Sequence, residues 1–146
     1  MRWTLGAVLS VVMSPVWAQE VVDCDWHARA DAIVEPWEVN TRRFAGGDVR
    51  LALLDTIEPA AGAFHILVLS PPYDELGGRQ CKTIGVSAGV GFSGAGFETL
   101  TARYDPAVGL SFAMEVTTYD PEYEFLSGTL IITLNQATGA IEAMLE

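Results

Sequence analysis

Seven short stretches of β-type sequence, separated by turn residues, constrain the fold more than any other feature of this chain. They occupy residues 49–53, 64–69, 80–88, 97–104, 110–117, 130–134 and 140–145. β-branched and aromatic residues are frequent within them, and Gly, Pro, Asp and Asn between them. The connections are too short for crossover helices, so consecutive strands are expected to pair antiparallel.

Two of these stretches are apolar throughout, FHILVL at 64–69 and LIITL at 130–134. A continuous apolar run is typical of a strand that is buried on both faces. Such strands need a second layer, which either an N-terminal helix or the opposite wall of a sandwich or barrel could provide.

The segment 23–35 shows a helical pattern. Asp23 is a suitable N-cap, and Pro36 disfavours helix at the residue before it. Apolar residues recur at helical spacing at Trp26, Ala30, Ile33 and Trp37. The segment also alternates with period two, which leaves a strand as the alternative, but its Ala and Asp content favours a helix.

We therefore predict an α+β fold, with this N-terminal helix packed on a curved antiparallel β-meander. The meander is expected to have about seven strands and the shape of a half-barrel or small barrel. Residues 19–146 are expected to form a single globular domain, for which their length is sufficient.

Residues 1–18 have the pattern of a cleavable secretory signal. Arg2 precedes an uncharged apolar stretch at 5–13, Pro15 interrupts it, and Ala18 occupies the residue before the expected cleavage site. The apolar stretch is too short to span a bilayer. We therefore expect an exported protein, periplasmic or secreted, whose mature chain does not insert into a membrane.

The chain is acidic, with a formal net charge of −11. Such a charge repels nucleic acid and anionic membrane surfaces, so no nucleic-acid partner is expected. Half of the residues are hydrophobic, which is typical of a folded domain rather than of an acidic disordered tail. The partner is unknown from the sequence, and a basic protein would complement this charge.

The chain has two cysteines, Cys24 and Cys81. In an oxidising compartment an isolated pair favours a single disulfide, here between residues 57 positions apart. The bond would tie the start of the expected helix to the strand at 80–88. Two free buried thiols are the alternative, and no CxxC redox motif is present.

A candidate metal site lies on the expected helix. Asp23, His27 and Asp31 are spaced at i, i+4 and i+8 and would share one helical face, where His27 could ligate a metal or act as a base. One histidine with two carboxylates falls short of a zinc ligand set, so a solvated helix face is the alternative. The second histidine, His65, lies in an apolar strand and is expected to be a core or interface residue.

Gly89, Gly91 and Gly94 match G-x-G-x-x-G after an apolar strand. In a dinucleotide-binding site these glycines open a helix, but here the following residues are Thr-rich and end at Asp105-Pro106. We interpret the motif as a Gly-rich hairpin loop or a sharply bent strand.

A candidate partner surface is the acidic, aromatic loop that contains Tyr119, Asp120, Glu122, Tyr123 and Glu124. Tyrosines among carboxylates suit a binding surface, although an ordinary exposed turn is the alternative. The oxygen spacing does not match an EF-hand loop.

No catalytic residue is assigned, since no serine lies in a G-x-S-x-G frame. No cofactor is expected. The sequence favours an exported, non-catalytic binding or interaction protein, with a basic protein or a small apolar ligand as its partner. A small metal-dependent or hydrolytic enzyme that uses His27 is one alternative, and a structural envelope component is the other.

Overall fold

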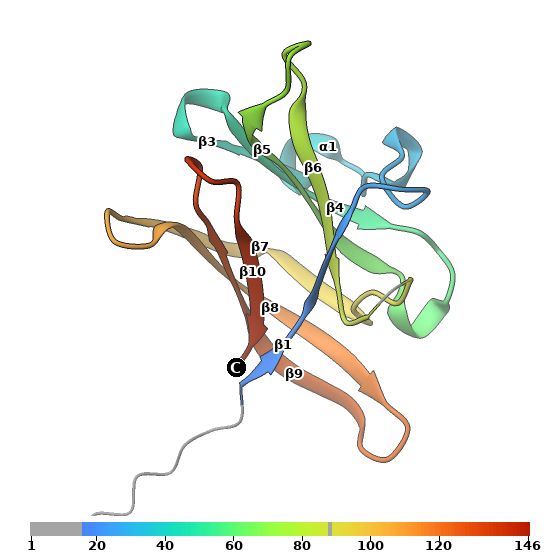
Figure 1. Cartoon of the computed structure of the whole chain (residues 1–146). Coiled ribbons are helices and arrows are strands. Elements are labelled where there is room, and N and C mark those ends of the chain that lie inside the picture. Colours follow the sequence, from blue (N-terminus) through green and yellow to red (C-terminus); the bar gives the residue numbers. More distant parts are fainter. Residues whose placement is uncertain (1–15, 88) are drawn as a thin grey trace, which may run out of the picture.

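The computed structural model describes residues 16–87 and 89–146, which form two five-stranded antiparallel sheets (Figure 1). Residues 1–15, most of the expected signal, lie outside the described residues. The last two residues of that signal, Trp17–Ala18, form β1, so cleavage after Ala18 would remove this strand from the mature protein. Sheet A contains, in spatial order, β1 (Trp17–Ala18), β10 (Ile141–Leu145), β9 (Glu124–Leu134), β8 (Gly109–Asp120) and β7 (Gly94–Asp105). Sheet B contains β2 (Glu20–Asp23), β6 (Arg79–Gly85), β5 (Phe64–Tyr73), β4 (Val49–Asp55) and β3 (Thr41–Phe44).

The start of the described chain joins the two sheets along one side. Only Gln19 separates β1 from β2, although the two strands belong to different sheets. The backbone N–H of Gln19 donates to the carbonyl oxygen of Ala143 at 2.8 Å, so this residue still lies against β10. A nearly continuous strand therefore passes from sheet A to sheet B.

One hydrophobic core lies between the sheets. Successive side chains of a strand point to opposite faces, so every second residue enters this core. Its largest fully buried side chains include Leu51, Ile66, Ile84, Phe97, Phe112 and Ile132. Each contributes about 2 kcal/mol by leaving water, which makes the inter-sheet core the main stabilising element.

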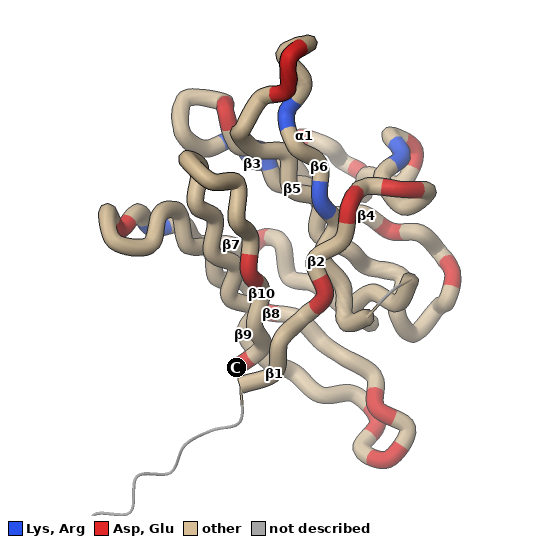
Figure 2. The backbone as a smooth tube through the Cα atoms, viewed as in Figure 1, with Lys and Arg blue, Asp and Glu red and all other residues tan. Residues whose placement is uncertain are grey.

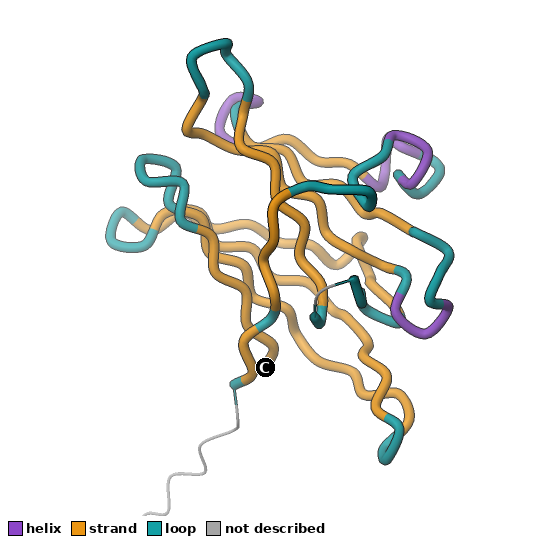
Figure 3. The backbone as a smooth tube through the Cα atoms, turned by 45° about the vertical axis from the view of Figure 1, so that its right-hand side comes forward, coloured by secondary structure: helices purple, strands orange, loops and turns teal. Residues whose placement is uncertain are grey.

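The predicted α+β fold is wrong, because the described chain is mainly β and no helix packs on either sheet. The segment expected to be helical contains the end of β2 and a 3-10 turn at Ala30–Ala32, and the single α-helical turn described, α1, follows at Trp37–Asn40. Figure 3 shows the helical segments as short turns between strands. No helix in the described ranges is long and apolar enough to cross a membrane.

Sheet pairing explains why the helix does not form. The backbone N–H of Cys24 donates to the carbonyl oxygen of Cys81 at 3.1 Å, and Ile33 forms a β-bridge with Leu54. These contacts fix both ends of the segment in extended conformation, and tertiary contacts of this kind override a helical pattern. The period-two alternation was therefore the relevant pattern at the start of the segment.

The seven predicted strand regions all contain strands, β4 to β10. The three strands that the sequence did not predict, β1, β2 and β3, have only two to four residues each. Strands this short carry too few residues for an alternating pattern to be recognised.

The predicted disulfide between Cys24 and Cys81 is confirmed. Asp23 pairs with Lys82 in the β2–β6 ladder, so the two cysteines continue this register by one position. The bond therefore fastens a loop segment, rather than a helix, to sheet B.

The glycine motif lies in the connection from β6 to β7. Gly94 begins a strand, not a helix, and Gly91 lies against the start of β5. A Cβ atom on Gly91 would lie 2.1 Å from the carbonyl oxygen of Phe64, which is far too short a contact. A Cβ atom on Gly94 would meet its nearest neighbour, in Thr117, at an ordinary 3.5 Å.

Gly91→Ala should lower the free energy of unfolding by about 3 kcal/mol, because the methyl group forces the connection away from β5. Gly94→Ala is the matched control within the same motif and should cost less than about 1 kcal/mol. Urea unfolding followed by tryptophan fluorescence measures both values. Equal losses would show that the motif requires glycine for backbone freedom and not for close packing.

Candidate functional site

The outer face of sheet A is hollowed along β7, β8 and β9. Three hollows of about 560, 380 and 210 Å³ are lined by residues of these strands. Because Phe112, Leu130 and Ile132 point into the core, the residues between them must point to this outer face. The hollows are therefore lined mainly by the residues that the core leaves out, with a core residue beneath each.

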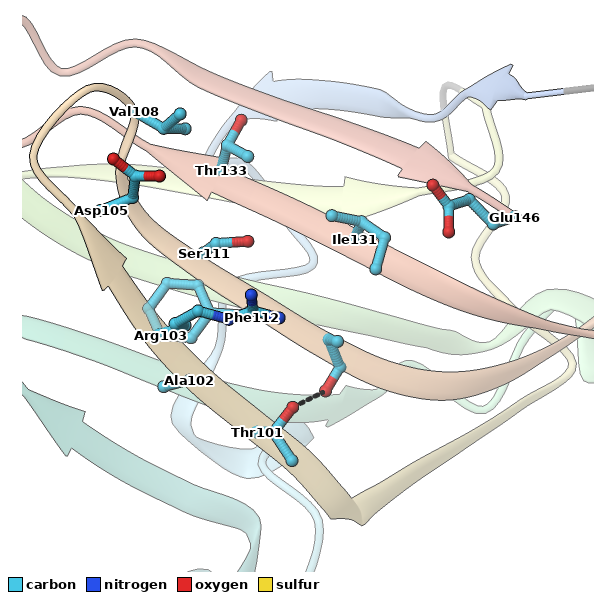
Figure 4. Close-up of a pocket in the computed structure, with 11 residues that line it drawn as sticks. Thr101, Ala102, Arg103, Asp105, Val108, Ser111, Phe112, Ile131, Thr133 and Glu146 are labelled. Carbon is cyan, nitrogen blue, oxygen red and sulfur yellow. Dashed lines mark hydrogen bonds between the residues drawn. The ribbon is translucent and has the colours of Figure 1, made fainter.

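Five oxygen-bearing side chains line the largest of these hollows, together with one cation and five apolar residues (Figure 4). The cation is Arg103, and Ile131 and Val108 supply apolar surface. The oxygen-bearing side chains are Thr101, Asp105, Ser111, Thr133 and Glu146. Such a surface can exchange hydrogen bonds with a polar ligand and attract a positive charge.

A β-bulge in β7 shapes this face. The β7–β8 register shifts between Gly96 and Thr101, and Thr99 lies inside the shift. The Thr99 hydroxyl accepts the backbone N–H of Glu115 at 2.9 Å and donates to the carbonyl oxygen of Gly96 at 2.7 Å. Bulges bend and twist the strand that contains them, and the threonine replaces the missing ladder bonds here.

The charge of this half of the molecule is almost entirely negative. Residues 89–146 contain eight Asp and Glu residues and a single Lys or Arg, Arg103. Residues 24–40, between β2 and β3, lie against sheet B and are called the N-terminal segment here. Figure 2 shows the other described basic residues on sheet B and on this segment. Within the described residues, both ion pairs, Arg29–Asp31 and Asp23–Lys82, also lie in that other half. The carboxylates of sheet A are therefore uncompensated.

The structure brings the predicted partner-surface residues together at the tip of the β8–β9 hairpin. Asp120 ends β8 and Glu124 begins β9. The Asp120 carboxylate accepts the backbone N–H groups of Glu122 at 2.8 Å and Tyr123 at 3.1 Å. This carboxylate therefore fixes the turn.

This tip also carries exposed aromatic surface. Tyr123 and Phe125 are each 63% exposed, and the Tyr119 ring lies 5.4 Å from that of Phe125. Tyr119 and Phe125 are cross-strand partners at positions that continue the outer face of sheet A. The hollowed face and the tip are therefore one surface, which we call the sheet A surface.

The three candidate metal ligands do not share a face. Asp23 lies at the end of β2 and pairs with Lys82, whereas Asp31 lies in the 3-10 turn beside Arg29. His27 is buried, whereas Asp23 and Asp31 are exposed. Nowhere in the described ranges do three or more His, Cys, Asp or Glu side chains gather in a way that could hold a metal ion.

His27 instead contacts His65, which the sequence correctly predicted to be buried. Their ring centroids lie 4.6 Å apart, and the Trp26 ring stacks on His27 at 3.9 Å. Neither nitrogen of His27, nor Nε2 of His65, has a hydrogen-bond partner among the described residues. Burial, and secondly the proximity of His27, lower the pKa of His65 from 6.5 to about 4. His65 is therefore neutral at pH 7, and its contact with His27 packs the N-terminal segment onto sheet B.

His65 should make stability depend on pH. The unfolded chain protonates His65 near pH 6.5, whereas the folded protein resists protonation until about pH 4. The unfolded state thus binds more protons in this window, so the free energy of unfolding should fall by about 2 kcal/mol between pH 7 and pH 5. His65→Gln cannot titrate, so its free energy of unfolding should change less than that of the wild type between pH 7 and pH 5. Urea unfolding at each pH measures this change in both proteins. The same change in both proteins, or an NMR titration of His65 near pH 6.5, would contradict this.

Two features of the sequence correspond to the sheet A surface, although neither forms a contiguous motif. Hydroxyl residues alternate with core residues along β7 and β9, and basic residues are almost absent after residue 82. Comparison with protein-family models, curated proteins and solved structures finds no match to this chain. Its function is therefore argued from this geometry and charge.

Proposed function

We propose that this protein is an exported, non-catalytic binding protein that docks a basic partner on the sheet A surface. The observation that carries this proposal is the coincidence of the hollowed face with the uncompensated negative charge of residues 89–146. Complementary charge steers a partner to its site, and the hydroxyl-lined hollows supply short-range hydrogen bonds.

The aromatic tip supports the same proposal. Buried aromatic anchors dominate the energy of many protein interfaces, and tyrosine is enriched there because it offers apolar area with a polar end. Tyr119, Tyr123 and Phe125 present such groups beside three carboxylates. A partner with basic side chains around an apolar patch fits this arrangement.

Export is supported by the signal pattern at residues 1–18 and by the disulfide, which is most stable outside reducing compartments. The periplasm and the external medium both satisfy these observations. Within either, the acidic surface faces a solvent in which free basic proteins can reach it.

The other functions considered have less support. A small apolar ligand would need space inside the curved sheets, but large side chains fill the core between them. An enzyme centred on His27 would need that ring to reach substrate, whereas it is buried between Trp26 and His65.

A charge-matched pair of variants tests the proposal. Asp105→Asn with Glu115→Gln removes two charges from the sheet A surface, and asparagine keeps an oxygen for the Ala107 N–H that Asp105 now accepts. Glu35→Gln with Glu38→Gln removes two exposed charges from the N-terminal segment. The probe is a ten-residue peptide in which every fourth residue is Lys and the others are Thr, so that a Lys opposite Asp105 leaves a Thr opposite Arg103. Binding is titrated by calorimetry at low ionic strength.

The surface variant should bind the peptide about tenfold more weakly than the wild type, and the control less than twofold. Added salt should weaken binding by the wild type. Equal weakening in both variants would mean non-specific attraction to net charge, and would overturn the proposed site. Absence of binding by the wild type would overturn it as well.

A further inference from the structure

The strand β7 ends in a segment that projects beyond the sandwich. Residues 101–105 are all exposed, although they alternate between the two faces of the sheet. β7 is also the last strand of sheet A, so one side of this segment has no neighbouring strand. Open strand edges are templates for pairing with another chain.

The hydrogen bonds of β8 show which backbone groups of β7 face outward. The N–H of Glu115 donates to Thr99, and the carbonyl of Thr117 accepts the N–H of Ser93, so odd-numbered residues of β8 direct their backbone groups toward β7. In the register, Ala113 and Ser111 lie opposite Thr101 and Arg103. Hydrogen-bonded pairs alternate along an antiparallel ladder, so these two residues of β7 bond to β8.

Ala102 and Tyr104 therefore direct their backbone groups to the open edge. Leu100 supports this parity, because its carbonyl oxygen points outward and accepts Nη1 of Arg42 at 2.7 Å. Among these three residues Arg42 donates to Leu100 only, and no described residue is a hydrogen-bond partner for the outward backbone groups of Ala102 or Tyr104. Two N–H and two carbonyl groups are thus free to pair.

We propose that this edge is a strand-addition site, at which an extended basic segment of the partner pairs with residues 101–105. The inference rests on the proposed function and specifies how the partner binds. Main-chain hydrogen bonds supply affinity in this mode, and alternate side chains supply specificity. Thr101, Arg103 and Asp105 line the largest hollow, so alternate side chains of the added strand lie along its margin (Figure 4).

The acidic residues beside this edge indicate that the partner's added strand is basic. A Lys or Arg placed across from Asp105 forms an opposite-charge cross-strand pair, and its long side chain can reach the hollow that Glu146 also lines. An acidic segment would meet the uncompensated carboxylates of this half of the molecule. The segment is therefore basic and extended.

A second copy of this chain fits the edge poorly. Two copies related by a two-fold axis would pair their β7 edges antiparallel. If all four free backbone groups are used, Ala102 of one copy lies opposite Tyr104 of the other, and the two Arg103 residues lie opposite each other. Like charges directly opposite each other destabilise a strand pair. The net charge of −11 also makes each copy repel the other.

Ala102→Pro tests the edge directly. Proline removes the outward N–H of residue 102 and leaves the ladder to β8 intact, since edge strands tolerate proline where the N–H faces solvent. Ala102→Val changes the side chain but keeps the N–H and is the matched control. The Lys–Thr peptide should bind Ala102→Pro at least about tenfold more weakly than the wild type, and Ala102→Val within twofold.

Amide hydrogen exchange of the wild-type protein is the second measurement, and it does not depend on the folding of a variant. Saturating peptide should slow exchange at Ala102 and Tyr104 more than tenfold. Unchanged exchange there, or full binding by Ala102→Pro alongside weak binding by the surface charge variant, would overturn strand addition and leave the proposed function standing. A dimer that Ala102→Pro abolishes would assign the edge to a second copy and overturn the basic segment.

Discussion

Burial of alternate side chains between two sheets determines the rest of this structure. Large residues such as Phe97, Phe112 and Ile132 leave water on the inner faces, and the pleat then places their neighbours outside. A slip of one residue in any strand would exchange the two sets, so the core fixes the register as well as the layers. The packing of the inner side chains thus fixes the positions of the hydroxyl and acidic residues on the outer face of sheet A.

The outer faces of the two sheets differ in what covers them. The N-terminal segment is tied by the disulfide at Cys24 and packed through the contact of His27 with His65, and it lies on sheet B. Sheet A carries its hollows, a projecting edge and an aromatic tip. Residues 89–146 contain eight acidic residues against one basic residue, whereas residues 16–87 contain eleven against six. The hollowed face therefore lies in the half with the larger excess of negative charge, which suits a basic partner.

The strands of the meander and the disulfide could be predicted from the sequence, because alternation, turn residues and cysteine pairing are local or compositional signals. The segment after Asp23 carried both a helical and a strand pattern, and only the pairing of Cys24 with Cys81 and of Ile33 with Leu54 decides between them. The tip was found because its residues are contiguous. The hollow was missed because its lining comes from three strands whose register is set by the fold.

Mapping of amide chemical shifts during titration with the Lys–Thr peptide tests the central claim most directly. The account predicts that perturbed residues fall on β7, β8 and β9 and on the tip around Tyr119 and Tyr123, with the N-terminal segment unaffected. Shifts spread over the acidic residues of both halves, or centred on the N-terminal segment, would contradict the assignment of the sheet A surface as the binding site.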